Sequence, residues 1–199
     1  MVRSLGDVVA VSAQPWDGMP RWWVQYSDGA QLDLVVGPAA ERPGRAPGAV
    51  VLFDRSMGRF DDEFVPSVLR ADPEEPRQWL LDGWEALSNV AKYLRRGSLL
   101  EAIEQLHRAR QRAFQLWCVG ERVEYPRFGL TSLLDAESAT LPPNVESTYP
   151  VVETESVRVA ASALAQVLRI AGSHAEGAPD TPLSEYVISR LQQARPGGA

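Results

Sequence analysis

The sequence predicts an α+β fold, in which a small β-sheet is followed by a helical domain built on an antiparallel helical hairpin. Apolar and polar residues alternate over much of residues 7–36, as expected for strands. Between residues 72 and 120, apolar residues instead recur every three or four positions in two stretches, each closed by a glycine. We therefore expect residues 1–68 to form the sheet domain and residues 69–199 to form the helical domain.

The sheet is predicted from strand-like segments at residues 7–13, 21–26 and 31–36. The Ser-Asp-Gly sequence at residues 27–29 is typical of a tight turn, so the second and third segments should form a hairpin. A fourth segment, residues 49–53, is a short continuous apolar run, which predicts a more deeply buried strand.

The helical hairpin is predicted from its end signals as well as its spacing. Asp72 and Glu75 have the positions of a capping box, and Gly97 can end the first helix in the left-handed conformation. Ser98 opens a second capping box at once, and Gly120 ends the second helix. Because so few residues separate them, the helices should lie antiparallel and bury their apolar stripes together. The stripes consist of Leu80, Trp84, Leu87, Ala91 and Leu94 in the first helix, and Leu99, Ile103, Leu106, Ala113 and Trp117 in the second.

Two further helices complete the predicted helical domain. One begins near residues 154–155 and carries a broad apolar face, and one begins at the Thr-Pro sequence of residues 181–182. The small residues on the apolar face of the first of these favour close helix packing.

Composition and charge limit the function classes. A net charge of −6 and a pI of about 5.0 argue against a broad nucleic-acid-binding surface. No signal peptide and no apolar run of membrane-spanning length are found in the sequence, so we expect a cytoplasmic protein that binds neither nucleic acid nor membrane. The single cysteine, Cys118, cannot form an internal disulfide, and its apolar surroundings predict a place in the core.

Asp33 stands out in the predicted hairpin because it interrupts an apolar strand. The alternation places Leu32 and Leu34 on one face and Asp33 on the other. A carboxylate within an apolar strand is disfavoured both by propensity and by desolvation. Two interpretations stay open: an aspartate on the solvent-exposed face of a hairpin, or a carboxylate that binds a metal ion or acts as a general base.

Lys92 is the only lysine of the chain. At 100° per residue it shares a polar stripe of the first predicted helix with Glu85, Asn89 and Arg96. This pattern also has two interpretations. The stripe is either a solvated helix face or the position of a phosphate-binding lysine, which presents a compact charge on a flexible stem.

Three short segments carry a resemblance to a known family. They are residues 28–36 (DGAQLDLVV), residues 89–94 (NVAKYL) and residues 125–132 (YPRFGLTS). Together they resemble the nucleotidyltransferase superfamily, in the bacterial branch related to aminoglycoside adenylyltransferases. The resemblance covers about residues 20–135.

The resemblance implies a small mixed sheet whose acidic residues hold Mg²⁺ and MgATP, and a helical domain that closes over the nucleotide. It implies that Asp33 is the third acidic residue, acting as a metal ligand or as the base that activates the attacking hydroxyl. It also implies that Lys92 reaches the triphosphate from the helical domain. The implied reaction is nucleotidyl transfer from ATP to a hydroxyl of a small acceptor such as an aminoglycoside.

The sequence departs from the family pattern before Asp33. The family has a Gly-Ser turn and an Asp-x-Asp strand there, and the 32 residues that precede Asp33 contain neither. We therefore expect an incomplete sheet, through loss of the first catalytic segment or a start placed too late, and no transfer activity from this chain alone. An incomplete sheet should leave an exposed edge for another chain to pair with. The alternatives are a non-enzymatic protein that binds a nucleotide or a protein partner, and a structural or interaction module.

Overall fold

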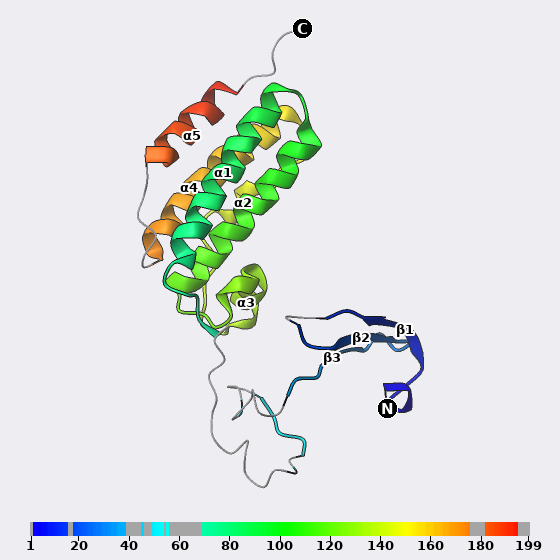
Figure 1. The fold of residues 1–199 in the computed structure, drawn as a ribbon. Coiled ribbons are helices and arrows are strands. Elements are labelled where there is room, and N and C mark those ends of the chain that lie inside the picture. Colours follow the sequence, from blue (N-terminus) through cyan, green and yellow to red (C-terminus); the bar gives the residue numbers. More distant parts are fainter. Residues whose placement is uncertain are drawn as a thin grey trace. The chain divides into compact units, whose positions relative to one another are not determined.

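The computed structural model describes residues 2–15, 18–38, 45, 49–53, 55, 69–175 and 182–194. The chain divides into two compact units, Met1–Pro66 and Ser67–Ala199. The first contains a three-stranded antiparallel sheet and the second contains the helices (Figure 1). This confirms the predicted α+β class, whereas the assignment of the first unit as a catalytic sheet stays a prediction. Among the described residues, no helix is both long and apolar enough to cross a bilayer.

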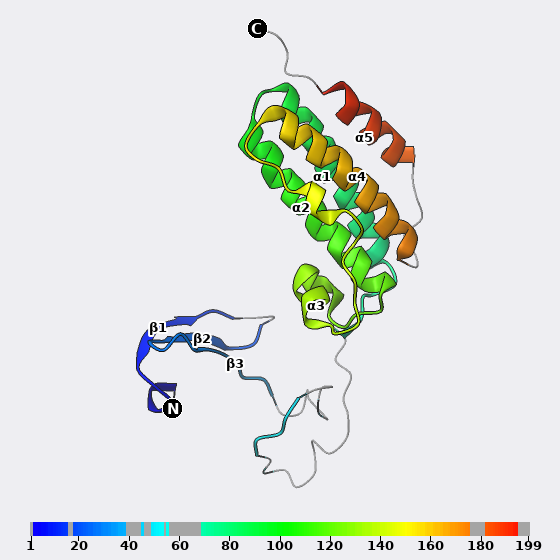
Figure 2. The same cartoon turned by 180° about the vertical axis from the view of Figure 1, so that it is seen from behind.

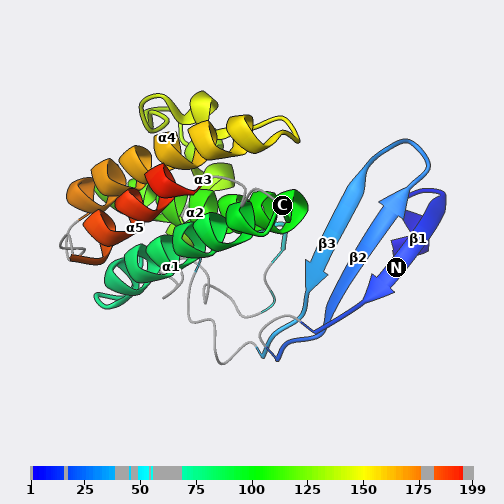
Figure 3. The same cartoon turned by 90° about the horizontal axis from the view of Figure 1, so that it is seen from above.

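The sheet consists of β1 (Val8–Ala13), β2 (Arg21–Tyr26) and β3 (Gln31–Val35), in that order, and the 3₁₀ turn η1 (Val2–Ser4) precedes it. Figure 3 shows the three strands side by side. In the turn between β2 and β3, Gly29 has a φ of 91°, a conformation that a residue with a side chain rarely adopts. β1 and β3 are the outer strands, and no described strand pairs with their free edges.

The two faces of the sheet differ in polarity. Val24 pairs with Leu32 on the apolar face and is fully buried. Trp23 pairs with Asp33 on the opposite face, where Asp33 is exposed. The position of Asp33 therefore follows from the alternation of side chains along β3.

The prediction of a fourth strand at residues 49–53 is wrong. The structure assigns no strand to these residues, and the side chains of Val50 and Leu52 are 80% and 90% exposed. An apolar run forms a strand only where a neighbour pairs with its backbone groups, and no described strand does so here.

The helical unit is built on α1 (Glu75–Arg95) and α2 (Leu99–Gly120), which form the predicted antiparallel hairpin (Figure 1). Gly97 has a φ of 71°, and its N–H donates to the carbonyl oxygen of Leu94 at 3.1 Å. This left-handed glycine ends α1 as predicted, and it reverses the chain within a few residues.

The two predicted capping boxes differ in outcome. The backbone N–H of Asp72 donates to Oε2 of Glu75 at 2.7 Å, which forms one half of the first box. The hydroxyl of Ser98 makes no capping bond to α2, so the prediction of a second capping box is wrong. Ser98 also completes the end of α1, because its N–H donates to the carbonyl oxygen of Tyr93. Its backbone conformation is therefore set by the preceding helix rather than by α2.

α4 (Thr154–His174) packs against both α1 and α2, and α5 (Pro182–Gln193) lies against α1 and α4 (Figure 2). α4 begins where the sequence predicted. Gly83 lets α4 approach α1 closely, because a Cβ at that position would lie 2.9 Å from the methyl groups of Leu168. The largest fully buried side chains of this core are Trp84, Leu87, Val90, Leu94, Leu106, Leu116, Val157, Leu164, Leu168, Val187 and Leu191.

The connection between α2 and α4 contains three short helical segments. They are the 3₁₀ turn η4 (Pro126–Phe128), the helix α3 (Leu130–Asp135) and the 3₁₀ turn η5 (Val145–Thr148). η4 and α3 cover the end of α2, where Cys118 is buried with its Sγ 3.3 Å from the carbonyl oxygen of Gly129, whereas η5 packs against α4. The side chain of Cys118 is fully buried, which confirms the predicted core position, and this burial raises the pKa of its thiol to about 12.

Candidate functional site

Lys92 lies in the last turn of α1 and is partly buried. Its Nζ donates to Oδ1 of Asn89 at 2.7 Å and lies 4.5 Å from the centre of the Tyr93 ring. Both partners are neutral, and no ion pair of Lys92 is found among the described residues. Asn89 and Tyr93 thus fix the position of the ammonium group, and no negative charge among the described residues pairs with it.

Two contacts within its own helix hold the Lys92 ammonium. An amide oxygen holds the ammonium by a hydrogen bond, and the Tyr93 ring attracts it by a cation–π interaction. Because neither partner carries a negative charge, the full charge of Lys92 stays available to an anionic group. Asn89, which the sequence placed on the same stripe, is the hydrogen-bond partner of Lys92.

Asp33, the other predicted site residue, is held by an arginine of the neighbouring strand. Nε and Nη2 of Arg21 donate to Oδ1 and Oδ2 of Asp33, each at 2.7 Å. The hydrogen bonds from Arg21 lower the pKa of the Asp33 carboxyl below its ordinary value, so the carboxylate is ionised and is a weak base. The signal for this pair was present in the sequence: the hairpin register places Arg21 diagonally across from Asp33.

The described residues do not form a magnesium site. Both oxygens of Asp33 are engaged by Arg21, so a metal ion would have to displace a bidentate ion pair. No group of three or more histidine, cysteine, aspartate or glutamate side chains comes together in the described part of the chain.

A cavity of about 330 Å³ lies next to the Arg21–Asp33 pair, lined by Ser12, Gln14, Arg21 and Trp23. Asp33 belongs to the first unit and Lys92 to the second, so the expectation that both act on one bound nucleotide stays a prediction.

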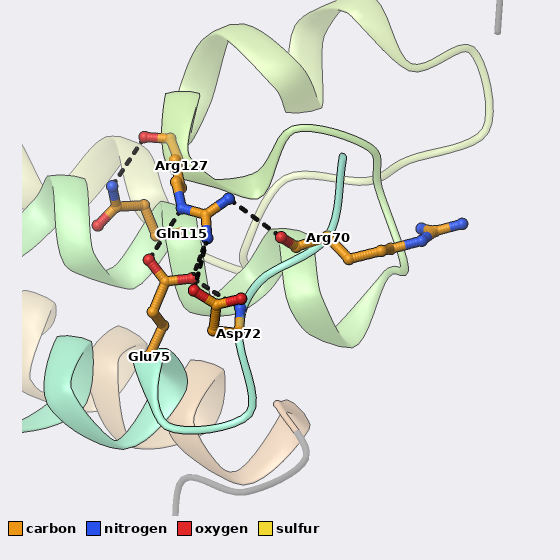
Figure 4. A network of polar contacts seen from close by, with 5 residues as sticks. All are labelled: Arg70, Asp72, Glu75, Gln115 and Arg127. Atoms are coloured by element: carbon orange, nitrogen blue, oxygen red, sulfur yellow. Dashed lines mark hydrogen bonds and ion pairs between the residues drawn. The ribbon is translucent and has the colours of Figure 1, made fainter. Parts of the chain in front are cut away.

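A polar network at the start of α1 was missed by the sequence analysis (Figure 4). Arg127 donates to Glu75 through Nε at 2.9 Å and through Nη2 at 2.7 Å. Its Nη2 also lies 3.2 Å from Oδ2 of Asp72, and its Nη1 donates to the carbonyl oxygen of Arg70 at 3.1 Å. The carbonyl oxygen of Arg127 in turn accepts from Gln115 at 2.8 Å. Arg127 therefore ties the segment that leads into α1 to η4 and α2.

Comparison with known proteins shows a likeness in structure. No protein-family model matches this sequence, and no curated protein matches it either. Among solved structures, an aminoglycoside 6-adenyltransferase from Bacillus subtilis is similar to this chain, with a TM-score of 0.50 and 14% sequence identity. The similarity covers 97% of this chain and 80% of that chain. At this level of identity the likeness shows the fold.

Proposed function

We propose that this chain is a nucleotidyltransferase-like protein whose helical unit binds the phosphates of a nucleotide through Lys92. The observation that carries the proposal is the environment of Lys92, a cation positioned by Asn89 and Tyr93 and left with its full charge. Phosphate oxygens are strong acceptors for such a group, which acts as a point charge. The fold of the adenyltransferase neighbour supports ATP as the ligand.

The reaction class that accompanies this proposal is nucleotidyl transfer to a hydroxyl of a small acceptor, such as an aminoglycoside. Mg²⁺ would supply charge stabilisation on the attacking and leaving oxygens in such a reaction. The described residues do not fit that ion, because Asp33 is occupied by Arg21. We therefore derive no transfer step, and we propose that these 199 residues bind the nucleotide without transferring it.

The proposal is tested by titrating the protein with ATP and with inorganic tripolyphosphate, followed by calorimetry or amide NMR. A single charge-assisted contact is worth about 1–3 kcal/mol, so Lys92→Gln should weaken binding about 5- to 150-fold. Binding itself should be millimolar at best for so few contacts, about −4 kcal/mol. Arg77→Gln, which removes an exposed cation elsewhere on α1, is the matched control and should bind as the wild type does. Equal binding by the Lys92→Gln and wild-type proteins would overturn the proposal.

An interaction module is the second candidate, and the sheet carries the observation that favours it. β1 and β3 have no described partner at their outer edges, and Val9 and Val11 of β1 are 67% and 46% exposed. An unpaired strand edge with exposed valines can pair with another chain. Concentration-dependent self-association in analytical ultracentrifugation, together with no nucleotide binding, would favour this candidate over the first.

A further inference from the structure

A cavity of about 460 Å³ lies where the chain leads into the helical unit. One wall is the segment of residues 70–76 before and at the start of α1. The other wall is the end of α2 with the loop that follows it. The lining comprises Arg70, Arg122 and Asp72 together with three prolines, two valines and one alanine. Most of these side chains are apolar, and two carry a guanidinium group.

The two walls are tied together independently of any ligand. The backbone N–H of Tyr125 donates to the carbonyl oxygen of Leu69 at 3.0 Å, and Nη1 of Arg70 donates to the carbonyl oxygen of Arg122 at 2.9 Å. Arg127 adds its bonds to the opposite wall (Figure 4). Three prolines in the lining further restrict the backbone. The cavity is therefore preformed, and a ligand would enter it with little ordering of the chain.

The loop of the second wall holds an unusual backbone. Arg122 and Tyr125 have φ angles of 58° and 56°, and they are two of the three non-glycine residues with positive φ in the described part of the chain. This conformation raises the free energy of a residue with a side chain, and it is common directly after the end of a helix. The positive φ of Arg122 belongs to the end of α2, where the N–H groups of Arg122 and Val123 donate to the carbonyl oxygens of Val119 and Cys118 at 3.1 and 2.8 Å, so this capping motif fixes the position of Arg122 in the cavity wall.

The charged residues of the lining indicate the kind of ligand that the cavity would bind. Arg70 and Arg122 are exposed, and neither forms an ion pair with a described residue. Figure 4 shows the guanidinium of Arg70 directed away from the Arg127 network. Asp72 is the acidic residue of the lining, and it makes one contact of 3.2 Å with Arg127, so the two arginines outnumber a single carboxylate. The cavity thus offers two cations beside an apolar surface, in a chain whose net charge is −6.

We propose that this cavity binds a small organic anion that joins an apolar body to a carboxylate or a phosphate. The prolines and valines would contact the body, while Arg70 and Arg122 would contact the anionic group. The site is separate from Lys92, which lies sixteen residues after Pro76 on α1, a distance of about 24 Å at 1.5 Å per residue. It therefore goes beyond the nucleotide binding proposed for Lys92.

The test is an amide NMR titration of the full chain with benzoate and with phenyl phosphate, and with benzyl alcohol as the neutral probe. Both anions should shift amide signals within residues 69–76 and 119–126. Arg70→Gln and Arg122→Asn should each weaken anion binding at least about fivefold, the loss expected for one charge-assisted contact. Asparagine is chosen at position 122 because it adopts positive φ more readily than most residues. Arg108→Gln removes an exposed arginine of α2 outside the cavity and should bind as the wild type does.

Two results would overturn the proposal. Equal binding of benzyl alcohol and benzoate, unchanged in the arginine variants, would show that the cavity selects no charge. Anion-induced shifts that centre on Lys92 instead of the cavity, and that vanish in Lys92→Gln, would place the anion at the other site. Failure of ATP binding leaves this test unaffected, because its probes and its variants are separate from those for Lys92.

Discussion

Replacing Arg127 by glutamine should destabilise the helical unit, chiefly through the loss of its pair with Glu75. Two hydrogen bonds join the side chains, and Arg127 and Glu75 are 31% and 27% exposed. The pair should therefore be worth more than the 0.2–1 kcal/mol typical of exposed pairs and less than a fully buried pair, that is about 1–2 kcal/mol. The contact with Asp72 is longer and that side chain is 73% exposed, so it should add only about 0.2–0.5 kcal/mol.

A double-mutant cycle isolates these values. Arg127→Gln, Glu75→Gln and the double variant are unfolded in urea while helicity is followed by circular dichroism, and a second cycle uses Asp72→Asn. Glu75→Gln keeps an acceptor for the backbone N–H of Asp72, so the cycle measures the loss of charge rather than the loss of the cap. Arg127→Lys is the matched control: it keeps the charge but lacks the planar fork, and it should recover less than half of the lost stability.

Two outcomes would refute this reasoning. A coupling free energy below about 0.3 kcal/mol between Arg127 and Glu75 would show that the pair behaves as a solvated surface contact. A larger coupling to Asp72 than to Glu75 would show that exposure and distance do not rank the two contacts.

Two further predictions concern single groups. Arg21 lowers the pKa of Asp33 below 3.8, so the pair should stabilise the fold above about pH 4 and lose that contribution as the pH falls through the folded-state pKa. In Arg21→Gln, NMR titration of the Asp33 carboxyl should show a higher pKa. An unchanged pKa would contradict the bidentate pair. Cys118, whose thiol pKa is raised to about 12 by burial, should not react with a thiol reagent at pH 8 until the protein is unfolded in urea, and rapid labelling of the folded protein would count against its buried position.

The helical hairpin was predictable because its determinants are local. The apolar spacing of α1 and α2 and the left-handed Gly97 between them involve residues a few positions apart, so they act on the chain before any tertiary contact forms. The β2–β3 hairpin was predictable for the same reason, since its turn and its alternation are contained in residues 21–35.

The two predictions that proved wrong, the strand at residues 49–53 and the Ser98 cap, depended on contacts that are not local. The apolar run at residues 49–53 has the composition of a strand, but a strand depends on a partner elsewhere in the chain. Ser98 has the sequence of a helix cap, but the end of α1 sets its backbone conformation. In the first case the local preference found no described pairing partner, and in the second it was overridden by the preceding helix.

The sequence by itself singled out Lys92 and Asp33 as candidate site residues, and the tertiary structure decided which partners those residues have. Lys92 was identified as the single lysine, with Asn89 on its stripe, because both belong to one helix. The ion pair of Arg127 with Glu75 spans 52 positions of the chain, so it forms only after η4 and α1 have been packed together. Periodicity encodes contacts within an element, whereas contacts between elements depend on how their surfaces pack, and no local pattern records that packing.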